Sequence, residues 1–210
     1  MISVIIATKN RDEALRNISL PSLLRQDTSD FEVILWDGSD SEKSRHVAEQ
    51  YVSLFEEKRV PLRYFRAPRV GSASQRNDAV QSAQGKIVFF IDDDSEVSPD
   101  GLSALEKCFG ESPECMGAGL MVLEKNTANK KEPLFGERLK HKLYAILGHV
   151  KRRKVHPSGS NRGLTAPPGP AEWLSGCSMA YRREVFSLMK FNEKLQIFGN
   201  DYPTPDGTGV

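Results

Sequence analysis

Long apolar runs, cysteine pairs and an excess of one charge are all missing from this sequence of 210 residues. No stretch is apolar over enough residues to cross a bilayer, which excludes an ordinary transmembrane helix. The three cysteines are an odd number without metal-ligand spacing, so we expect reduced, buried thiols in a cytoplasmic protein. The net charge of +1 favours no class of partner. The length and the 39% of apolar residues are typical of one soluble globular domain.

Two kinds of glycine-rich loop are also missing. The segment after the first predicted strand, residues 7–11, contains no glycine, which disfavours a nucleotidyltransferase with a phosphate loop at that point. No Gly-x-Gly-x-x-Gly follows a strand, which disfavours a dinucleotide-binding oxidoreductase. Residues 1–6 lack the basic lead-in and the cleavage site of a signal peptide, so we interpret them as a strand.

The first two-fifths of the chain alternate apolar strands with helical patterns, which predicts an α/β fold with a mainly parallel sheet flanked by helices. Asn10 with Glu13, and Ser39 with Glu42, resemble helix-capping arrangements. Pro21 is expected to kink or end the first helix. The expected strands span residues 2–7, 31–36, 62–65 and 86–91, with a weaker one at 116–123. The helix after Ser39 is predicted to bury Val47, Tyr51, Leu54 and Phe55.

Residues 125–170 interrupt this alternation with a basic segment and a Gly/Pro/Ser-rich stretch, which we interpret as an insertion and not as a separate domain. The lysines and arginines of residues 130–154 form either a solvated surface or a contact for acidic lipid headgroups, which attract clustered basic residues. Nucleic acid is disfavoured as a partner, because no aromatic residues for base stacking alternate with these charges.

Carboxylates at the ends of predicted strands are the strongest chemical signal. Asp92, Asp93 and Asp94 directly follow the most apolar strand, and Asp37 ends another. Adjacent like charges stay close where a cation compensates them, and Mg²⁺ typically takes one or two carboxylates together with phosphate oxygens. The alternatives are that residues 92–94 form an acidic loop that caps the next helix, and that Asp37 forms a turn and caps a helix. The carboxyl ends of strands in an α/β sheet are where ligands bind, which favours a site. Arg76, on a helix, is either solvated or bound to a diphosphate.

The order of six segments gives these signals a common context. Each is a weak motif alone, but all six occur in the order and spacing of one family. The chain resembles the family 2 glycosyltransferases of the GT-A (nucleotide-diphospho-sugar transferase) fold over nearly its whole length. The matching segments are residues 4–11, 36–40 (Trp-Asp-Gly-Ser-Asp), 71–77, 90–94 (Phe-Ile-Asp-Asp-Asp), 173–183 and 191–201.

This resemblance implies a metal-dependent, inverting transfer of sugar from a nucleotide-diphosphate sugar to an acceptor hydroxyl, in polysaccharide or glycolipid assembly. It implies a single domain with a nucleotide-sugar-binding part (1–124), the basic insertion (125–170) and an acceptor-side part (171–210). It places Thr8, Asp37, Arg76, Asp92 and Asp93 at the nucleotide, Asp94 and Asp92 at Mn²⁺ or Mg²⁺, and Asp201 as the catalytic base.

The implied partners are a donor, guessed to be a UDP-sugar, and a saccharide or lipid-linked acceptor. The implied location is the cytoplasm, with peripheral contact at the inner membrane face through residues 130–154. The sequence departs from the family at Trp36 and Asn200, where acidic residues are usual. The family pattern stops after Asp201, so we interpret the chain as truncated. A fragment that binds a nucleotide sugar without transferring it is the alternative.

Overall fold

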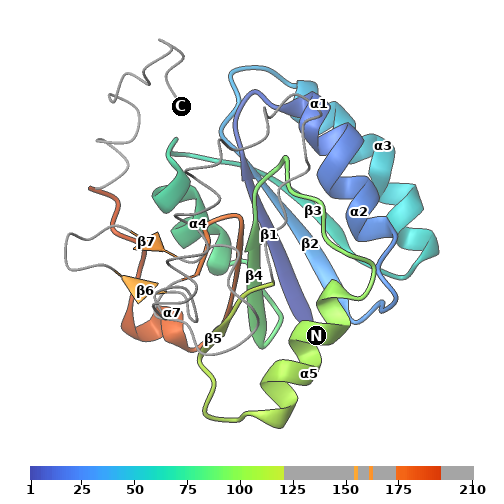
Figure 1. The fold of residues 1–210 in the computed structure, drawn as a ribbon. Coiled ribbons are helices and arrows are strands. Elements are labelled where there is room, and N and C mark those ends of the chain that lie inside the picture. The colour runs from blue at the N-terminus through green and yellow to red at the C-terminus, as the bar shows by residue number, and fades with distance from the viewer. Residues whose placement is uncertain (121–153, 156–160, 163–173, 195–210) are drawn as a thin grey trace, which may run out of the picture.

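A six-stranded sheet forms the centre of the protein (Figure 1). The computed structural model describes residues 1–120, 154–155, 161–162 and 174–194. The strand order is β3-β2-β1-β4-β8-β5; β1 to β4 run parallel, and β8 is antiparallel to β4 and β5. The mainly parallel α/β sheet predicted from the sequence is confirmed. The strands are β1 (Ile2–Thr8), β2 (Phe31–Asp37), β3 (Leu62–Arg66), β4 (Ile87–Ile91), β5 (Gly117–Ala118) and β8 (Ser178–Arg182), and a separate two-stranded sheet pairs β6 (Lys154–Val155) with β7 (Asn161–Arg162).

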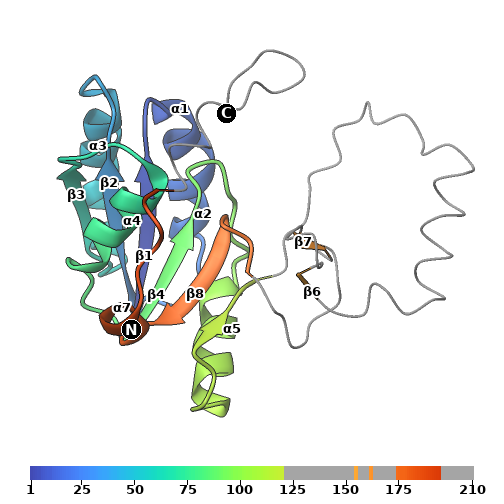
Figure 2. The ribbon, with the colours of Figure 1, turned by 90° about the vertical axis from the view of Figure 1, so that its left-hand side faces the viewer.

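Helices cover both faces of the sheet, so the central strands are apolar on both sides. In β1, Val4 and Ile6 pack into one core and Ile5 into the other. Helices α2, α3 and α5 contribute to the first core and α4 to the second, which gives three layers (Figures 1 and 2). The helices are α1 (Asp12–Ala14), α2 (Leu20–Leu24), α3 (Lys43–Glu57), α4 (Ser72–Val80), α5 (Gly101–Glu111) and α7 (Val185–Leu188). Within the described residues, no helix combines the length and apolar composition that crossing a bilayer requires.

The first helical segment is continuous through Pro21, where the sequence predicts a kink or an end. A π-helical turn, η1 (Leu15–Ser19), joins α1 to α2. Pro21 lacks an N–H group, and its ring crowds the carbonyl four residues earlier. The wider π turn lies directly before it, which is one of the recognised ways in which a helix absorbs such a distortion.

Several local expectations are wrong. Helices α1 and α3 have no side-chain cap: their N-cap residues are Arg11 and Glu42, and the side chains of Asn10 and Ser39 bond to Asp40 and Asp37 instead. Leu54, expected in the core, is an exposed residue of α3. None of the three cysteines is fully buried, and Cys108 is exposed on α5. Helical spacing predicts which side of a helix faces inward, but neighbouring elements decide where that side ends.

Candidate functional site

Three parallel strands deliver their polar ends to the same edge of the sheet. Thr8 ends β1 and pairs in register with Asp37, which ends β2. Asp92 follows directly after β4, the other neighbour of β1. We name the carboxyl ends of β1, β2 and β4 the site edge. It brings together Thr8, Asp37 and Asp92, three of the five residues that the resemblance places at the nucleotide.

Hydrogen bonds join the loop after β1 to the loop after β2 at this edge. Asn10 adopts a left-handed backbone (φ 56°), which asparagine tolerates better than most residues. Its carboxamide exchanges two hydrogen bonds with Asp40, from Nδ2 to the carboxylate (2.7 Å) and from the Asp40 N–H to Oδ1 (2.9 Å). Its own N–H donates to Ser39 Oγ (2.7 Å). These bonds fix the loop after β1 against the loop after β2.

Asp37 is fully buried, and both carboxylate oxygens are occupied. Oδ1 accepts hydrogen bonds from the backbone N–H (2.8 Å) and the hydroxyl of Ser39. Oδ2 accepts from the Tyr64 hydroxyl (2.7 Å) and, at the longer distance of 3.4 Å, from Arg66. Burial and the bond to Asp37 raise the pKa of Tyr64 to about 12, so this hydroxyl stays a donor at neutral pH. The carboxylate is therefore oriented by three residues before any ligand arrives.

The three consecutive carboxylates differ in their hydrogen-bond and ion-pair partners, although Asp93 and Asp94 share Arg11. Asp92 Oδ1 accepts from Arg76 (2.9 Å). Asp93 is buried and accepts from the Thr8 hydroxyl (2.7 Å), and its other oxygen lies 3.0 Å from Arg11 Nε. Asp94 is exposed and pairs with the terminal nitrogen of Arg11 (2.6 Å). Burial raises the pKa of Asp93, although the Thr8 bond and the Arg11 charge oppose this shift.

Three consecutive polar residues of helix α4, Gln75 to Asn77, bond it to neighbouring parts of the fold. Its first residue follows Gly71, whose φ of 136° suits glycine and strains other residues. Gln75 is buried and donates to the carbonyls of Thr8 (3.0 Å) and Trp36 (2.9 Å), which holds the helix against β1 and β2. Arg76 reaches Asp92 and also donates to the Gly176 carbonyl (3.3 Å).

Asn77, the third of these residues, holds the chain that leaves β8. Its carboxamide donates to the Phe191 carbonyl (3.0 Å) and accepts from the Phe191 N–H (2.9 Å). It also donates to Glu193 (3.0 Å), which pairs with Arg69 (2.7 Å). The Phe191 ring packs edge-on against Phe90 at a centroid distance of 5.3 Å. Residues 191–193 are thus bound to α4 directly beside Arg76.

Asp92 and Asp94 suit a hard divalent cation only if the ligand supplies further oxygens. Within the described part of the chain, no group of three or more His, Cys, Asp or Glu residues could hold a metal ion. The side chains of Asp92 and Asp94 are 42% and 47% exposed, and described residues bond to only one oxygen of each. Two accessible carboxylates with phosphate oxygens and water match the usual Mg²⁺ coordination.

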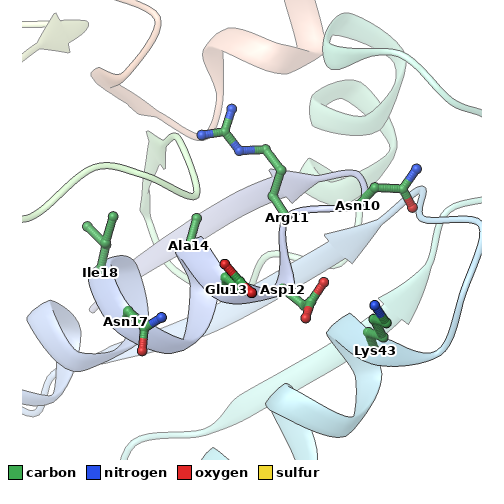
Figure 3. Close-up of a pocket in the computed structure, with 8 residues that line it drawn as sticks. All are labelled: Asn10, Arg11, Asp12, Glu13, Ala14, Asn17, Ile18 and Lys43. Atoms are coloured by element: carbon green, nitrogen blue, oxygen red, sulfur yellow. The ribbon is translucent and has the colours of Figure 1, made fainter.

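An open depression of about 580 Å³ adjoins the site edge, between the start of α1 and the start of α3. Figure 3 shows that the side chains of Arg11 and Asp12 point in opposite directions from the start of α1. Glu13, which the sequence pairs with Asn10 as a capping arrangement, lines this depression. The lining residues are Asn10, Arg11, Asp12, Glu13, Ala14, Asn17, Ile18 and Lys43.

The structure brings most of the predicted site residues together, and it adds others. Asp201 and most of the 130–154 basic region lie outside the described residues. Sequence reasoning missed Arg11, Tyr64, Arg66, Gln75 and Asn77. A usable signal existed for Arg66, which ends β3 and pairs in register with Asp37. Gln75 and Asn77 lie in the segment 71–77 that resembles the family, but their contacts could not be predicted, because the directions of adjacent helical side chains depend on how the helix is docked.

The chain is similar in sequence to known glycosyltransferases. WcaA of Escherichia coli (strain K12), named as a colanic acid biosynthesis glycosyl transferase, is 36% identical over 104 residues, which are 49% of this chain and 36% of that protein. The GalNAc(5)-diNAcBac-PP-undecaprenol beta-1,3-glucosyltransferase of Campylobacter jejuni is 29% identical over 104 residues, or 50% of this chain and 33% of that protein. The chain thus spans about a third of the length of these relatives.

Solved structures agree in fold. The mannosyltransferase PcManGT from Pyrobaculum calidifontis, in complex with GDP-Man and Mn²⁺, superposes with a TM-score of 0.62 at 17% identity, covering 91% of this chain and 47% of that one. TarS 1-349 of S. aureus gives 0.60 at 22% identity, covering 93% and 51%. These likenesses establish the GT-A fold. The sequence profile of glycosyl transferase family 2 matches residues 3–187, and the chain therefore belongs to that family.

Proposed function

We propose that this chain binds a nucleoside-diphosphate sugar at the site edge and transfers the sugar, with inversion, to an acceptor hydroxyl. The observation that carries this proposal is the convergence of Thr8, Asp37, Arg76 and the three consecutive aspartates on one edge of the sheet. Membership of glycosyl transferase family 2 supports the same reaction class. In this proposal residues 1–124 bind the donor, and residues 171–210 contribute the acceptor side.

The nucleobase binds at Asp37 in this account, and Arg66 is the contact that gives way. A carboxylate offers about four lone-pair positions, and Ser39, Tyr64 and Arg66 supply four donors. The Arg66 contact is the longest of these at 3.4 Å, and Arg66 is largely exposed. A ring N–H would therefore replace Arg66 at Asp37 Oδ2, while the Ser39 and Tyr64 bonds keep the carboxylate oriented. Thr8 and Asp93 lie beside this position, and Asp92 would face the ribose.

The proposed cofactor is Mn²⁺ or Mg²⁺, held by Asp94 and Asp92 together with diphosphate oxygens. PcManGT, which shares the fold, was solved with GDP-Man and Mn²⁺. When bound, such an ion neutralises negative charge on the departing diphosphate. Arg76 stabilises the same charge from the protein side, as a fixed guanidinium that needs no reorganisation.

The proton chemistry falls to Asp201. The acceptor oxygen forms a bond to the anomeric carbon on the face opposite the diphosphate, and the bond between that carbon and the diphosphate oxygen breaks. Asp201 takes the proton of the acceptor hydroxyl, and the nucleoside diphosphate leaves with the bonding electron pair. We assign this role to Asp201 because its position in the sequence corresponds to the catalytic base of the family. The neighbouring Asn200 carries an amide, which cannot accept the proton in its place.

The acceptor class and location are proposed from charge. We expect residues 130–154 to contact acidic headgroups at the inner face of the membrane, where a lipid-linked acceptor would be found. The C. jejuni relative bears PP-undecaprenol in its name. Co-sedimentation with vesicles containing acidic lipid should exceed that with neutral vesicles and fall at high salt. Equal sedimentation with both would contradict the membrane contact.

Replacement of a proposed metal ligand should remove the metal dependence of donor binding. Asp94→Ala is expected to weaken nucleoside-diphosphate binding in Mn²⁺ by at least about 10–100-fold. Replacing a residue that only hydrogen-bonds to a metal ligand already costs that much in metal affinity. Binding in chelator should change little. Calorimetry measures both. Asp30→Ala is the matched control, because Asp30 is an exposed carboxylate with one ion pair, to the Met1 amine, just before β2 begins. An unchanged Mn²⁺ effect in Asp94→Ala would remove Asp94 from the metal site.

A further inference from the structure

Two arginines neutralise the three consecutive aspartates, and they are held very differently. Arg76 is 15% exposed and is fixed by Asp92, by the Gly176 carbonyl and by the Phe191 ring, 6.0 Å from the guanidinium carbon. Arg11 is 52% exposed and makes its ion pairs only with Asp93 and Asp94 among the described residues. Arg76 is therefore a fixed charge, whereas Arg11 is an exposed side chain held by Asp93 and Asp94 alone among the ion pairs of the described residues.

The Arg11 guanidinium lies against one of the two carboxylates proposed to hold the metal. It bridges Asp93 Oδ1 (3.0 Å) and Asp94 Oδ2 (2.6 Å). Asp94 is one of the two proposed metal ligands. A divalent cation and a guanidinium on the same carboxylate repel each other, so a metal bound at Asp94 weakens the contact of Arg11 with Asp94. Exposed ion pairs are weak because water screens them, so the Arg11–Asp94 contact is the one that yields.

Free volume beside Arg11 permits this movement. Arg11 lines the open depression of about 580 Å³ next to the site edge. The Arg11 side chain points away from the neighbouring carboxylate of Asp12 (Figure 3). The Arg11 backbone is anchored, because its carbonyl accepts a hydrogen bond from the Leu15 N–H (3.1 Å). The movement is thus confined to the side chain.

We propose that Arg11 is a built-in counter-ion, which holds Asp93 and Asp94 in the empty site and transfers to the diphosphate when metal and nucleotide bind. A guanidinium forms equally good two-point hydrogen bonds with carboxylate and phosphate, so the exchange replaces like with like. It makes Arg11 a second diphosphate-binding residue beside Arg76. This inference rests on the proposed donor site.

Arg11→Gln should change two affinities in opposite directions. Mn²⁺ added without nucleotide should bind several-fold more tightly than to the unaltered chain, because the competing charge is gone. UDP in saturating Mn²⁺, or GDP if the unaltered chain prefers it, should bind about tenfold more weakly, because a charged hydrogen-bond donor to phosphate is lost. Arg45→Gln is the control, since Arg45 is similarly exposed and pairs with glutamates of the α3 region.

A melting measurement completes the test. In chelator, Arg11→Gln should melt at a lower temperature than the unaltered chain, because Asp93 and Asp94 lose their counter-ion, and Mn²⁺ should restore most of the difference. Weaker binding of both Mn²⁺ and UDP would indicate a merely structural role and overturn the inference, as would two unchanged affinities. If the unaltered chain binds neither ion nor nucleotide, the donor site itself is wrong, and this inference falls with it.

Discussion

Asp201→Asn should abolish most of the turnover and leave donor binding intact. General-base assistance is typically worth about 10²–10⁴ in rate, and an amide cannot accept the proton of the acceptor hydroxyl. Asn200 occupies the neighbouring position where the family usually has glutamate, so no second carboxylate can replace Asp201 there. Sugar transfer to a working acceptor measures turnover, and calorimetry with the nucleoside diphosphate measures binding.

Asp206 offers a control for the Asp201 experiment. Asp206→Asn removes a carboxylate from the same end of the chain and should change neither quantity. Equal turnover in Asp201→Asn and the unaltered chain would rule out Asp201 as the base. Donor binding without transfer to any acceptor, even in the unaltered chain, would favour a nucleotide-sugar-binding fragment instead.

Glu32→Ala should greatly lower the free energy of unfolding, although Glu32 lies away from the site edge. Glu32 is buried near the start of β2 and accepts hydrogen bonds from the Ser3 hydroxyl (2.6 Å), the Gln84 N–H (2.7 Å) and Arg63 (2.6 Å). Removing one partner of a buried ion pair costs about 3–5 kcal/mol, because the other charge is left without compensation. Denaturant unfolding should show this decrease in the free energy of unfolding.

An exposed glutamate provides the comparison for this experiment. Glu57→Ala, at the end of α3, should change the free energy of unfolding by no more than about 0.5 kcal/mol. A loss below about 1 kcal/mol in Glu32→Ala would mean that water reaches the Arg63 side chain and replaces the carboxylate. The double variant Glu32→Ala/Arg63→Ala should recover part of the loss, since it removes the orphaned charge as well.

The strands, and the edge of the sheet at which the candidate site residues meet, could be predicted because both follow from local pattern and one geometric rule. Val4 to Ile6 and Val88 to Ile91 are apolar at every position, which requires a sheet covered on both faces. Parallel strands then place Thr8, Asp37 and Asp92 at one edge. The same rule applies to Arg66, which ends the next parallel strand, yet its contact with Asp37 was missed.

The partners of the site residues could not be predicted, because they depend on contacts between loops. Asn10 and Ser39 have the residue types of helix caps, but each is used to join the loops after β1 and β2. The three aspartates diverge because Thr8, Arg11 and Arg76 approach them from different elements. These partners are determined when segments distant in sequence pack together, so residue spacing along the chain does not predict them.

The donor site is tested most directly by titrating the 210-residue chain with UDP, GDP and the other nucleoside diphosphates in a calorimeter, once in Mn²⁺ and once in chelator. The account predicts that one nucleotide binds and that its binding weakens by at least about tenfold when the metal is removed. A folded chain that binds none of them, or that binds one equally well in chelator, would contradict a metal-dependent nucleotide site at this edge of the sheet.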